Sequence, residues 1–313
     1  MLNRVLVPFL VCAAAIAQTA PAPAAPTNDV TFFKTFGSDG VPGSFRAKFS
    51  RNGAGLVFVQ ALDHYVTLEA RRKAEHGPGD WLLLSVNNDH SLRLVGDRGA
   101  AFPVDIGTAP WTATEIDGGV TFTIDSTTGL ELEKTLRHDP RGLGFTIEIA
   151  LKNRSSQATG ALPLQLIGPT LAVPAESSLF GNLATSIATP LQGDYVYAVP
   201  KPGTPPQELK LDPKALSFAG STNRFFGAFL WPHDDAARAA LTKFEADSLP
   251  SADDADSHTK AGTAARVRYS LALAIPAVNA ETRVKYGFYL GPKSYRVFEK
   301  LPHPERFAPI LDV

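Results

Sequence analysis

Three things are scarce in this 313-residue sequence: cysteine, net charge of either sign, and long apolar runs. Thirty Lys and Arg residues against 31 Asp and Glu residues give a net charge of -1. The sequence therefore lacks the basic excess that is typical of nucleic-acid binding, and it lacks a strong field toward a charged membrane surface. After the first 17 residues, no segment approaches the roughly 18 consecutive apolar residues of a membrane-spanning helix.

The N-terminus has the three parts of an export signal. Asn3 and Arg4 form a short positive region, residues 5–17 are apolar, and Ala15-Ile16-Ala17 fits a small-residue cleavage site. We expect cleavage before Gln18 and a periplasmic location; without cleavage, the segment would tether the chain to the inner membrane. The only cysteine, Cys12, lies in this segment, so the mature chain could form no disulfide or cysteine metal site. No small residue precedes Cys12, which argues against a lipoprotein.

Composition and local pattern divide the rest of the chain. Residues 18–28 are rich in Pro and Ala and predict an extended linker. Residues 29–313 predict one large folded domain, because 44% of the sequence is hydrophobic and 19% is charged.

Apolar and polar residues alternate with a period of two through most of this domain. Because successive side chains of a strand point to opposite faces, each such run predicts a strand with one buried face. Turn signals at 52–53, 117–119 and 139–142 separate the runs, and the last predicts a hairpin between 130–137 and 143–151. We therefore expect an all-β fold of antiparallel sheets packed face to face. The clearest runs are 45–49, 120–124, 143–151, 267–275 and 284–290.

Helix signals are few. Near the C-terminus, Pro292 can occupy a first helical position, and Tyr295, Phe298 and Leu301 follow at helical spacing. Residues 234–247 are rich in Ala and favour a helix, although strands surround them and a strand stays open. We interpret the acidic segment 248–264 as an exposed loop.

Several segments, in this order, resemble the periplasmic domain of the YidC family of membrane-protein insertases. The sequence YGFYLGPKSY at 286–295 is similar to the family's aromatic-rich strand and its Gly-Pro-Lys turn. The sequence NRFFGAFLWPHDD at 223–235 resembles a second family strand, and 132–153 resembles a strand-turn-strand unit. Residues 45–65 fit the family's opening hairpin more weakly.

The resemblance covers about residues 40–310. It implies a β-supersandwich of two large antiparallel sheets with a short C-terminal helix. It also implies a non-enzymatic, docking or chaperone-like role beside the translocon or the insertase core. The printed sequence stops at Val313, so the family's membrane-embedded insertase residues have no counterparts in it. Whether the chain stands alone or is the N-terminal part of a longer insertase stays open.

The sequence offers no strong catalytic or cofactor motif. Its seven histidines show no metal-ligand spacing, and we expect no catalytic residue, cofactor or metal. The acidic residues Asp234 and Asp235 predict solvated positions rather than a cation site. Aromatic residues at this density are mostly expected in the core, but Trp231 and His233, at a strand end, are candidates for a partner-binding surface.

Two other functions remain open from the sequence. A carbohydrate-binding or aldose-epimerase-like protein would need a His and a carboxylate converging in an open cleft. The nearest sequence pairs are His64 with Asp63 and His138 with Asp139, but neighbours on a strand point to opposite faces, which argues against both. A structural envelope protein without a specific partner is the third possibility.

Overall fold

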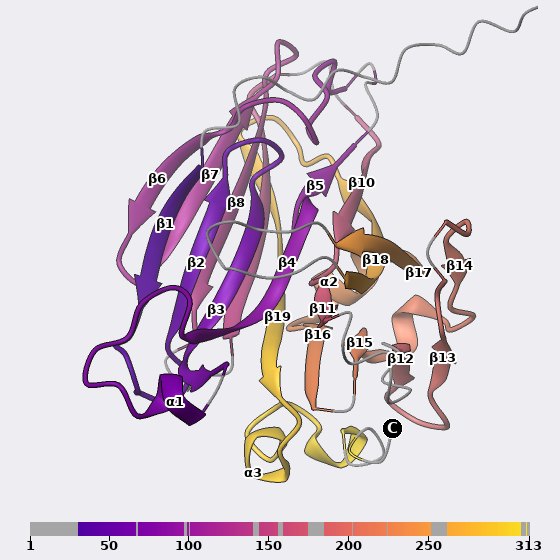
Figure 1. Cartoon of the computed structure of the whole chain (residues 1–313). Helices are drawn as coiled ribbons and strands as arrows, with labels where there is room; N and C mark the ends of the chain where they lie inside the picture. The colour runs from indigo at the N-terminus through magenta and orange to yellow at the C-terminus, as the bar shows by residue number, and fades with distance from the viewer. Residues whose placement is uncertain are drawn as a thin grey trace, which may run out of the picture.

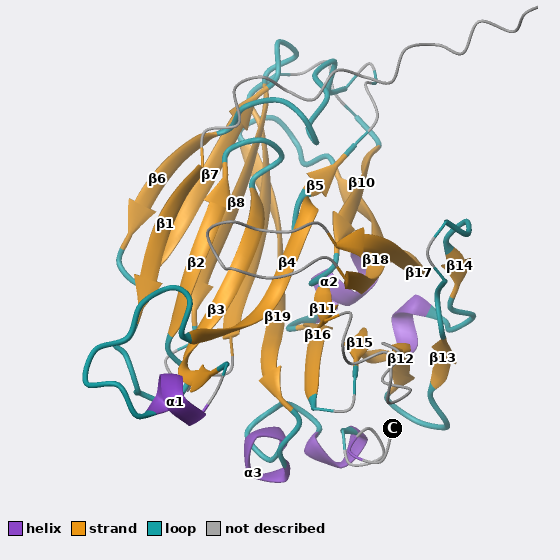
Figure 2. Ribbon diagram, viewed as in Figure 1, coloured by secondary structure: helices purple, strands orange, loops and turns teal. Residues whose placement is uncertain are grey.

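The computed structural model describes residues 31–311 apart from positions 67, 97–98, 100, 140–143, 156–158, 175–184, 202, 224, 252–261 and 308–310. Strands dominate, and all the described pairings are antiparallel. Figures 1 and 2 show long strands forming the body of the molecule, with short helical segments connecting or following them. Within the described part of the chain, no helix is long and apolar enough to cross a membrane.

The strands form sheets of nine, six and four strands. In sheet order, the largest comprises β13 (Val196–Ala198), β12 (Thr185–Pro190), β15 (Leu216–Thr222), β16 (Phe226–Pro232), β19 (Ala280–Pro292), β9 (Gly144–Asn153), β8 (Leu130–His138), β7 (Gly119–Asp125) and β6 (Thr112–Ile116). The four-stranded sheet comprises β1 (Thr31–Phe36), β2 (Phe45–Ser50), β3 (Gly55–Tyr65) and β4 (Trp81–Ser91). The six-stranded sheet comprises β14 (Gln207–Glu208), β17 (Leu241–Ser251), β18 (Gly262–Ala274), β10 (Ala161–Ile167) and β5 (Leu94–Val95), with β11 (Leu171–Pro174) also paired to β18.

The two smaller sheets face the nine-stranded sheet and together make the second layer of a sandwich. Phe32 of β1 packs against Phe122 of β7, with ring centroids 6.3 Å apart. In the six-stranded sheet, the hydroxyl of Tyr269 donates to the Ala219 carbonyl of β15 at 2.7 Å. One continuous cluster of buried apolar side chains fills the space between the layers. The all-β sandwich prediction is therefore confirmed.

The strands, the hairpin and the C-terminal helix predicted from the sequence are also present. The expected strands correspond to β2, β7, β9, β18 and β19, and β8 pairs with β9 as the predicted hairpin, although its turn lies outside the described residues. The C-terminal helix forms as a single turn, α3 (Tyr295–Phe298). Its start was predicted too early, because Pro292 ends β19 and Ser294 is the N-cap residue. The predicted leader and linker lie outside the described residues.

Two segments differ from their sequence interpretation. The ambiguous segment 234–247 is both a helix and a strand: α2 (Asp235–Ala240) ends where β17 begins at Leu241. The interpretation of 248–264 as a loop was wrong at both ends, since β17 continues to Ser251 and β18 begins at Gly262. Cross-strand pairing, such as that of Ser248 with Ala265, satisfies the backbone there despite weak local strand signals.

Candidate binding groove at one end of the sandwich

Two adjoining hollows lie at one end of the sandwich and share Asp63 and His64. The first is an open depression of about 770 Å³, lined mainly by residues from the end of β3 and from α1 (Leu68–Arg71). The second is a slot of about 250 Å³ between β2 and β3 on one side and β19 and α3 on the other. Both short helices lie at the lower end of the molecule in Figure 1. We call the two hollows together the groove.

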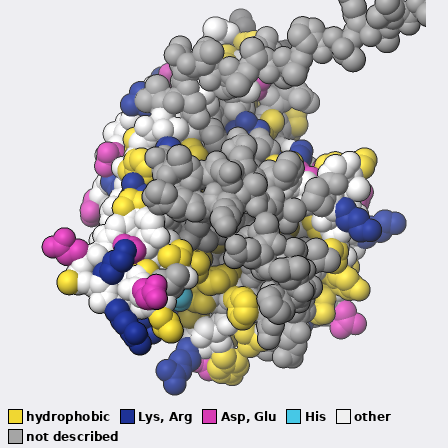
Figure 3. All heavy atoms as spheres, viewed as in Figure 1, with side chains coloured by type: hydrophobic (Ala, Val, Ile, Leu, Met, Phe, Trp, Pro, Cys, Tyr) yellow, Lys and Arg dark blue, Asp and Glu magenta, His cyan; other side chains and the backbone are white. Residues whose placement is uncertain are grey.

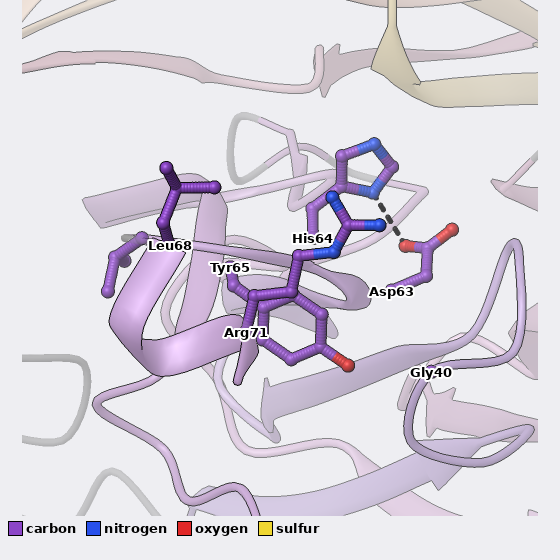
Figure 4. Close-up of a pocket in the computed structure, with 7 residues that line it drawn as sticks. Gly40, Asp63, His64, Tyr65, Leu68 and Arg71 are labelled. Atoms are coloured by element: carbon purple, nitrogen blue, oxygen red, sulfur yellow. Dashed lines mark hydrogen bonds and ion pairs between the residues drawn. The ribbon is translucent and has the colours of Figure 1, made fainter. Parts of the chain in front are cut away.

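An irregularity in β3 brings Asp63 and His64 together. Ala61 pairs with Leu82 and Tyr65 pairs with Trp81, so the three residues between Ala61 and Tyr65 face no residue of β4. Such a bulge breaks the strict alternation of side chains. As a result, His64 Nδ1 lies 2.8 Å from Asp63 Oδ1, which corrects the expectation that neighbouring positions keep these two side chains apart. Figure 4 shows this pair beside the open depression.

Each oxygen of the Asp63 carboxylate accepts a hydrogen bond from a neighbouring residue. Its Oδ1 accepts from His64 Nδ1, because an ionised carboxylate can only accept, and its Oδ2 accepts from the Gly43 N–H at 3.0 Å. Burial raises the pKa of Asp63, but the hydrogen bonds from His64 and Gly43 outweigh it and leave the pKa below its ordinary value. Asp63 is therefore ionised at neutral pH, and it fixes the orientation of the His64 ring.

Arg71 is the free donor of the depression. Arg71 is exposed and makes no hydrogen bond or ion pair with any residue that the structure describes. In Figure 4 the Arg71 and His64 side chains extend into the same space, with Tyr65 beneath Arg71. Tyr65 donates to Asp39 at 3.4 Å and is therefore already used. Arg71, which can only donate, and the outward Nε2 of His64, which accepts in the neutral ring because Nδ1 donates to Asp63, are left to contact a ligand.

A second acidic residue, Asp39, supports the wall beside the depression. It accepts from His76 Nδ1 at 2.6 Å and from Trp81 Nε1 at 2.9 Å. Desolvation raises the pKa of Asp39, but the bonds from His76 and Trp81 bring it below its ordinary value. These contacts connect the β1–β2 loop to the segment before β4 and to Trp81, the first residue of β4.

The slot is mainly apolar, and one of its walls comes from the β19 segment that resembles the YidC family. Tyr289, Leu290, Gly291 and Pro292 line it from β19, within the YGFYLGPKSY sequence. Burial, and then the negative charge of Asp63, raise the pKa of Tyr289, so its phenol stays neutral. The opposite wall and the floor comprise Pro42, Phe45, Ala61 and Leu84.

The two residues predicted for a partner surface separate in the structure. Trp231 is only 5% exposed and belongs to an aromatic cluster that α3 helps to cover, so it is not accessible to a partner here. His233 is exposed, directly before α2. Its role in partner binding stays a prediction. Most aromatic residues of the segment 223–235 were expected in the core. This holds for Phe229 and Trp231, whereas Phe225 is exposed.

The other candidate residues have structural roles. Asp234 caps α2 by accepting from the Ala237 N–H at 2.7 Å. Trp111 is buried and donates to the Ile106 carbonyl. His138 bonds to the Gly43 carbonyl at 2.8 Å rather than forming a catalytic pair in a cleft. Among the described residues, no cluster of His, Cys, Asp and Glu could hold a metal ion.

The family profile described as the YidC periplasmic domain matches residues 43–312. The chain belongs to the YidC periplasmic domain family. The match includes β3 and β19, whose residues form the groove, and it indicates an extracytoplasmic location. Sequence reasoning identified the β19 segment; it named the Asp63–His64 pair but rejected it on strand alternation, and it missed Arg71, which belongs to no recognisable local motif.

Comparison with solved structures gives remote similarities to this YidC-type domain. A GalM/aldose epimerase homologue from C. elegans has 10% identity and a TM-score of 0.42, with 85% of this chain and 100% of that chain covered. A 4-alpha-glucanotransferase from Thermococcus litoralis has 10% identity and a TM-score of 0.39, covering 84% and 39%. Heparan sulfate lyase HepC from Pedobacter heparinus has 7% identity and a TM-score of 0.39, covering 86% and 36%. No curated protein matches the chain.

Proposed function

We propose that this YidC-type domain acts outside the cytoplasm as a non-enzymatic docking surface for proteins of membrane insertion, namely the translocon or an insertase core. The observation that carries the proposal is the family match over residues 43–312. The groove supports it, because the β19 segment that marks the family also lines the slot.

The groove carries the groups that recognition of a polar ligand needs. Asp63 orients the His64 ring through Nδ1, and Arg71 adds a cation beside this pair. Arg71 can donate to a ligand, and Nε2 of the neutral His64 ring can accept from one, without any covalent step. We therefore propose a role in recognition, with no cofactor.

Co-purification from envelope extracts tests this function. The full chain, carrying an affinity tag, is expressed in a cell that contains the insertion machinery, and an unrelated exported β-sandwich of similar size is the control bait. We expect translocon or insertase components to be enriched with the full chain and not with the control. Equal recovery with both baits, under conditions where a full insertase enriches them, would contradict the proposal and favour a structural envelope role.

One observation favours a second candidate function, saccharide binding. Asp63 and His64 do converge in an open depression, next to Arg71 and Tyr65, which is the arrangement that a sugar-binding or epimerase-like protein requires. A glycan array with the full chain, followed by NMR of aldose anomer exchange, tests this function. A saturable glycan signal that Arg71→Gln abolishes would support it. No signal together with unchanged anomer exchange would remove it.

A further inference from the structure

We propose that the groove binds an extended polypeptide segment in which a carboxylate lies within a residue or two of a medium-sized apolar side chain. This inference rests on the proposed docking function and names the chemistry of the segment that docks. It follows from the free guanidinium of Arg71 in the depression, the size of the slot, and the two residues that line both hollows.

The depression selects for an acceptor. Arg71 faces the open volume and makes no hydrogen bond or ion pair with a residue that the structure describes, and each oxygen of Asp63 already accepts one hydrogen bond. A guanidinium has donors only, arranged in a fork that matches a carboxylate. A cationic or donor-rich ligand would leave Arg71 without a partner, so an acidic side chain or a C-terminal carboxylate is the complementary group.

The slot selects for an apolar group of limited size. Its volume of about 250 Å³ is below the roughly 300–1,000 Å³ of pockets that hold a complete small molecule. It can therefore accept one or two side chains but not a long acyl chain. Pro42, Phe45 and Leu290 give it an apolar lining, and burial there is favourable by about 0.8 kcal/mol for each methylene group removed from water.

The spacing between the two subsites is short, because Asp63 and His64 border both hollows. A carboxylate held by Arg71 and an apolar side chain in the slot must then come from nearby positions of one chain. Successive residues of an extended segment are about 3.3 Å apart and alternate in direction, which matches two subsites on either side of a single pair.

The rim of the depression adds exposed apolar surface for the rest of the segment. Leu68 is 68% exposed, and Val66 and Val41 are each 49% exposed. Leu68 and Val66 line the depression directly. Figure 3 shows hydrophobic side chains beside both basic and acidic side chains at this lower end of the molecule. A contiguous apolar patch beside a cation suits an amphipathic peptide better than a purely acidic one.

Fluorescence anisotropy with the full chain tests the inference. The probe is a fluorescein-labelled, ten-residue peptide of Gly and Ser with a central Leu-Asp pair; matched peptides carry Leu-Asn or Ser-Asp. We expect the Leu-Asp peptide to bind about tenfold more tightly than either, since both a charge-assisted contact and an apolar contact are needed. Arg71→Gln should remove this preference for Asp over Asn, whereas Arg72→Gln, an exposed neighbour outside the groove, should retain it.

Three results would overturn the inference. Equal binding of the three peptides would show that the groove recognises neither the carboxylate nor the apolar side chain. Equal loss in Arg71→Gln and Arg72→Gln would indicate nonspecific charge attraction. Displacement of the peptide by vesicles of anionic phospholipid, but not by excess unlabelled peptide, would assign the groove to lipid. If envelope partners still co-purify with Arg71→Gln in wild-type amounts, the docking function stands and only the groove assignment fails.

Discussion

Trp231 and Gly287 face each other across the β16–β19 pairing, and the indole ring of Trp231 occupies the space where a side chain at 287 would begin. A Cβ atom at 287 would lie 2.1 Å from Trp231 Cε2. The glycine therefore allows the tryptophan to lie flat against the sheet beneath the C-terminal aromatic cluster. This contact explains why a residue that seemed suited to a binding surface is buried.

Replacement of Gly287 by Ala should destabilise the fold. The added methyl would displace the Trp231 ring, and overpacking of this kind costs about 1–3 kcal/mol. Urea unfolding followed by tryptophan fluorescence measures the loss. Gly77→Ala is a matched control, because a methyl at 77 would meet Asp80 Oδ2 at 3.9 Å, an ordinary van der Waals contact, and the stability of this variant should stay within about 0.5 kcal/mol of wild type. Equal stability of Gly287→Ala and wild type would contradict this reading of the contact.

Lys134 should make stability rise with pH above neutrality. It is fully buried between the layers and donates to the carbonyls of Ala54 and Leu92. Burial lowers the pKa of Lys134 from 10.5 to about 7. Between these values the unfolded chain holds a proton that the folded chain lacks, so raising the pH favours the folded state by up to about 1.4 kcal/mol per pH unit.

Unfolding of wild type and Lys134→Met, compared from pH 7 to 9, measures this effect. The stability of wild type should rise relative to that of the variant over this range. Higher pH is avoided because burial raises the pKa of Tyr269 and Tyr286, and the titration of such tyrosines in the unfolded chain opposes the effect. Parallel curves for the two proteins would show that Lys134 keeps its proton in the fold.

Asp247 should be essential to the six-stranded sheet. Its Oδ2 accepts from Arg266 at 2.7 Å and from Arg268 at 2.5 Å, and Arg266 is fully buried. Asp247→Asn removes the carboxylate that Arg266 and Arg268 share, and removal of one partner of a buried ion pair typically costs about 3–5 kcal/mol. Glu245→Gln, which breaks a partly exposed pair with Lys243, should cost less than about 1 kcal/mol.

The difference between wild type and Asp247→Asn should depend on pH. Burial raises the pKa of Asp247, but the two arginines outweigh it, so the folded pKa lies below the ordinary 3.8. The stabilisation is complete above that ordinary value and is lost as the pH falls through the folded pKa. Chemical unfolding at pH 7 and at pH 3 measures the difference, and a larger gap at pH 3 than at pH 7 would refute the assignment.

The mature protein should begin at Gln18. Residues 5–17 are apolar but too short to span a bilayer comfortably, and Ala15 and Ala17 supply the small residues that signal peptidase requires. Intact mass and N-terminal sequencing of the exported chain test this expectation. Recovery of the full-length chain in the membrane fraction would instead indicate an uncleaved anchor, and Ala17→Leu should convert a cleaved chain into that form.

Sequence alone determined the fold class and much of the local structure. Period-two alternation is set by the backbone itself, so runs such as 284–290 could be assigned without knowledge of their partners. The β8–β9 hairpin was predictable because the turn signal at 139–142 lies between two strand-forming segments. In contrast, the two ends of 248–264 form strands because β17 and β18 pair there. This stabilisation comes from cross-strand contacts, which local composition does not reveal.

The candidate site depended on tertiary structure. The alternation rule placed Asp63 and His64 on opposite faces, and a bulge opposite β4 brought them together. Arg71 reaches the same space from a helix that has no recognisable motif, and the slot exists only where β19 and α3 approach the end of β3. The one-dimensional pattern thus fixed which residues face a core, because burial repeats with the backbone. Which side chains meet was decided by packing between distant segments.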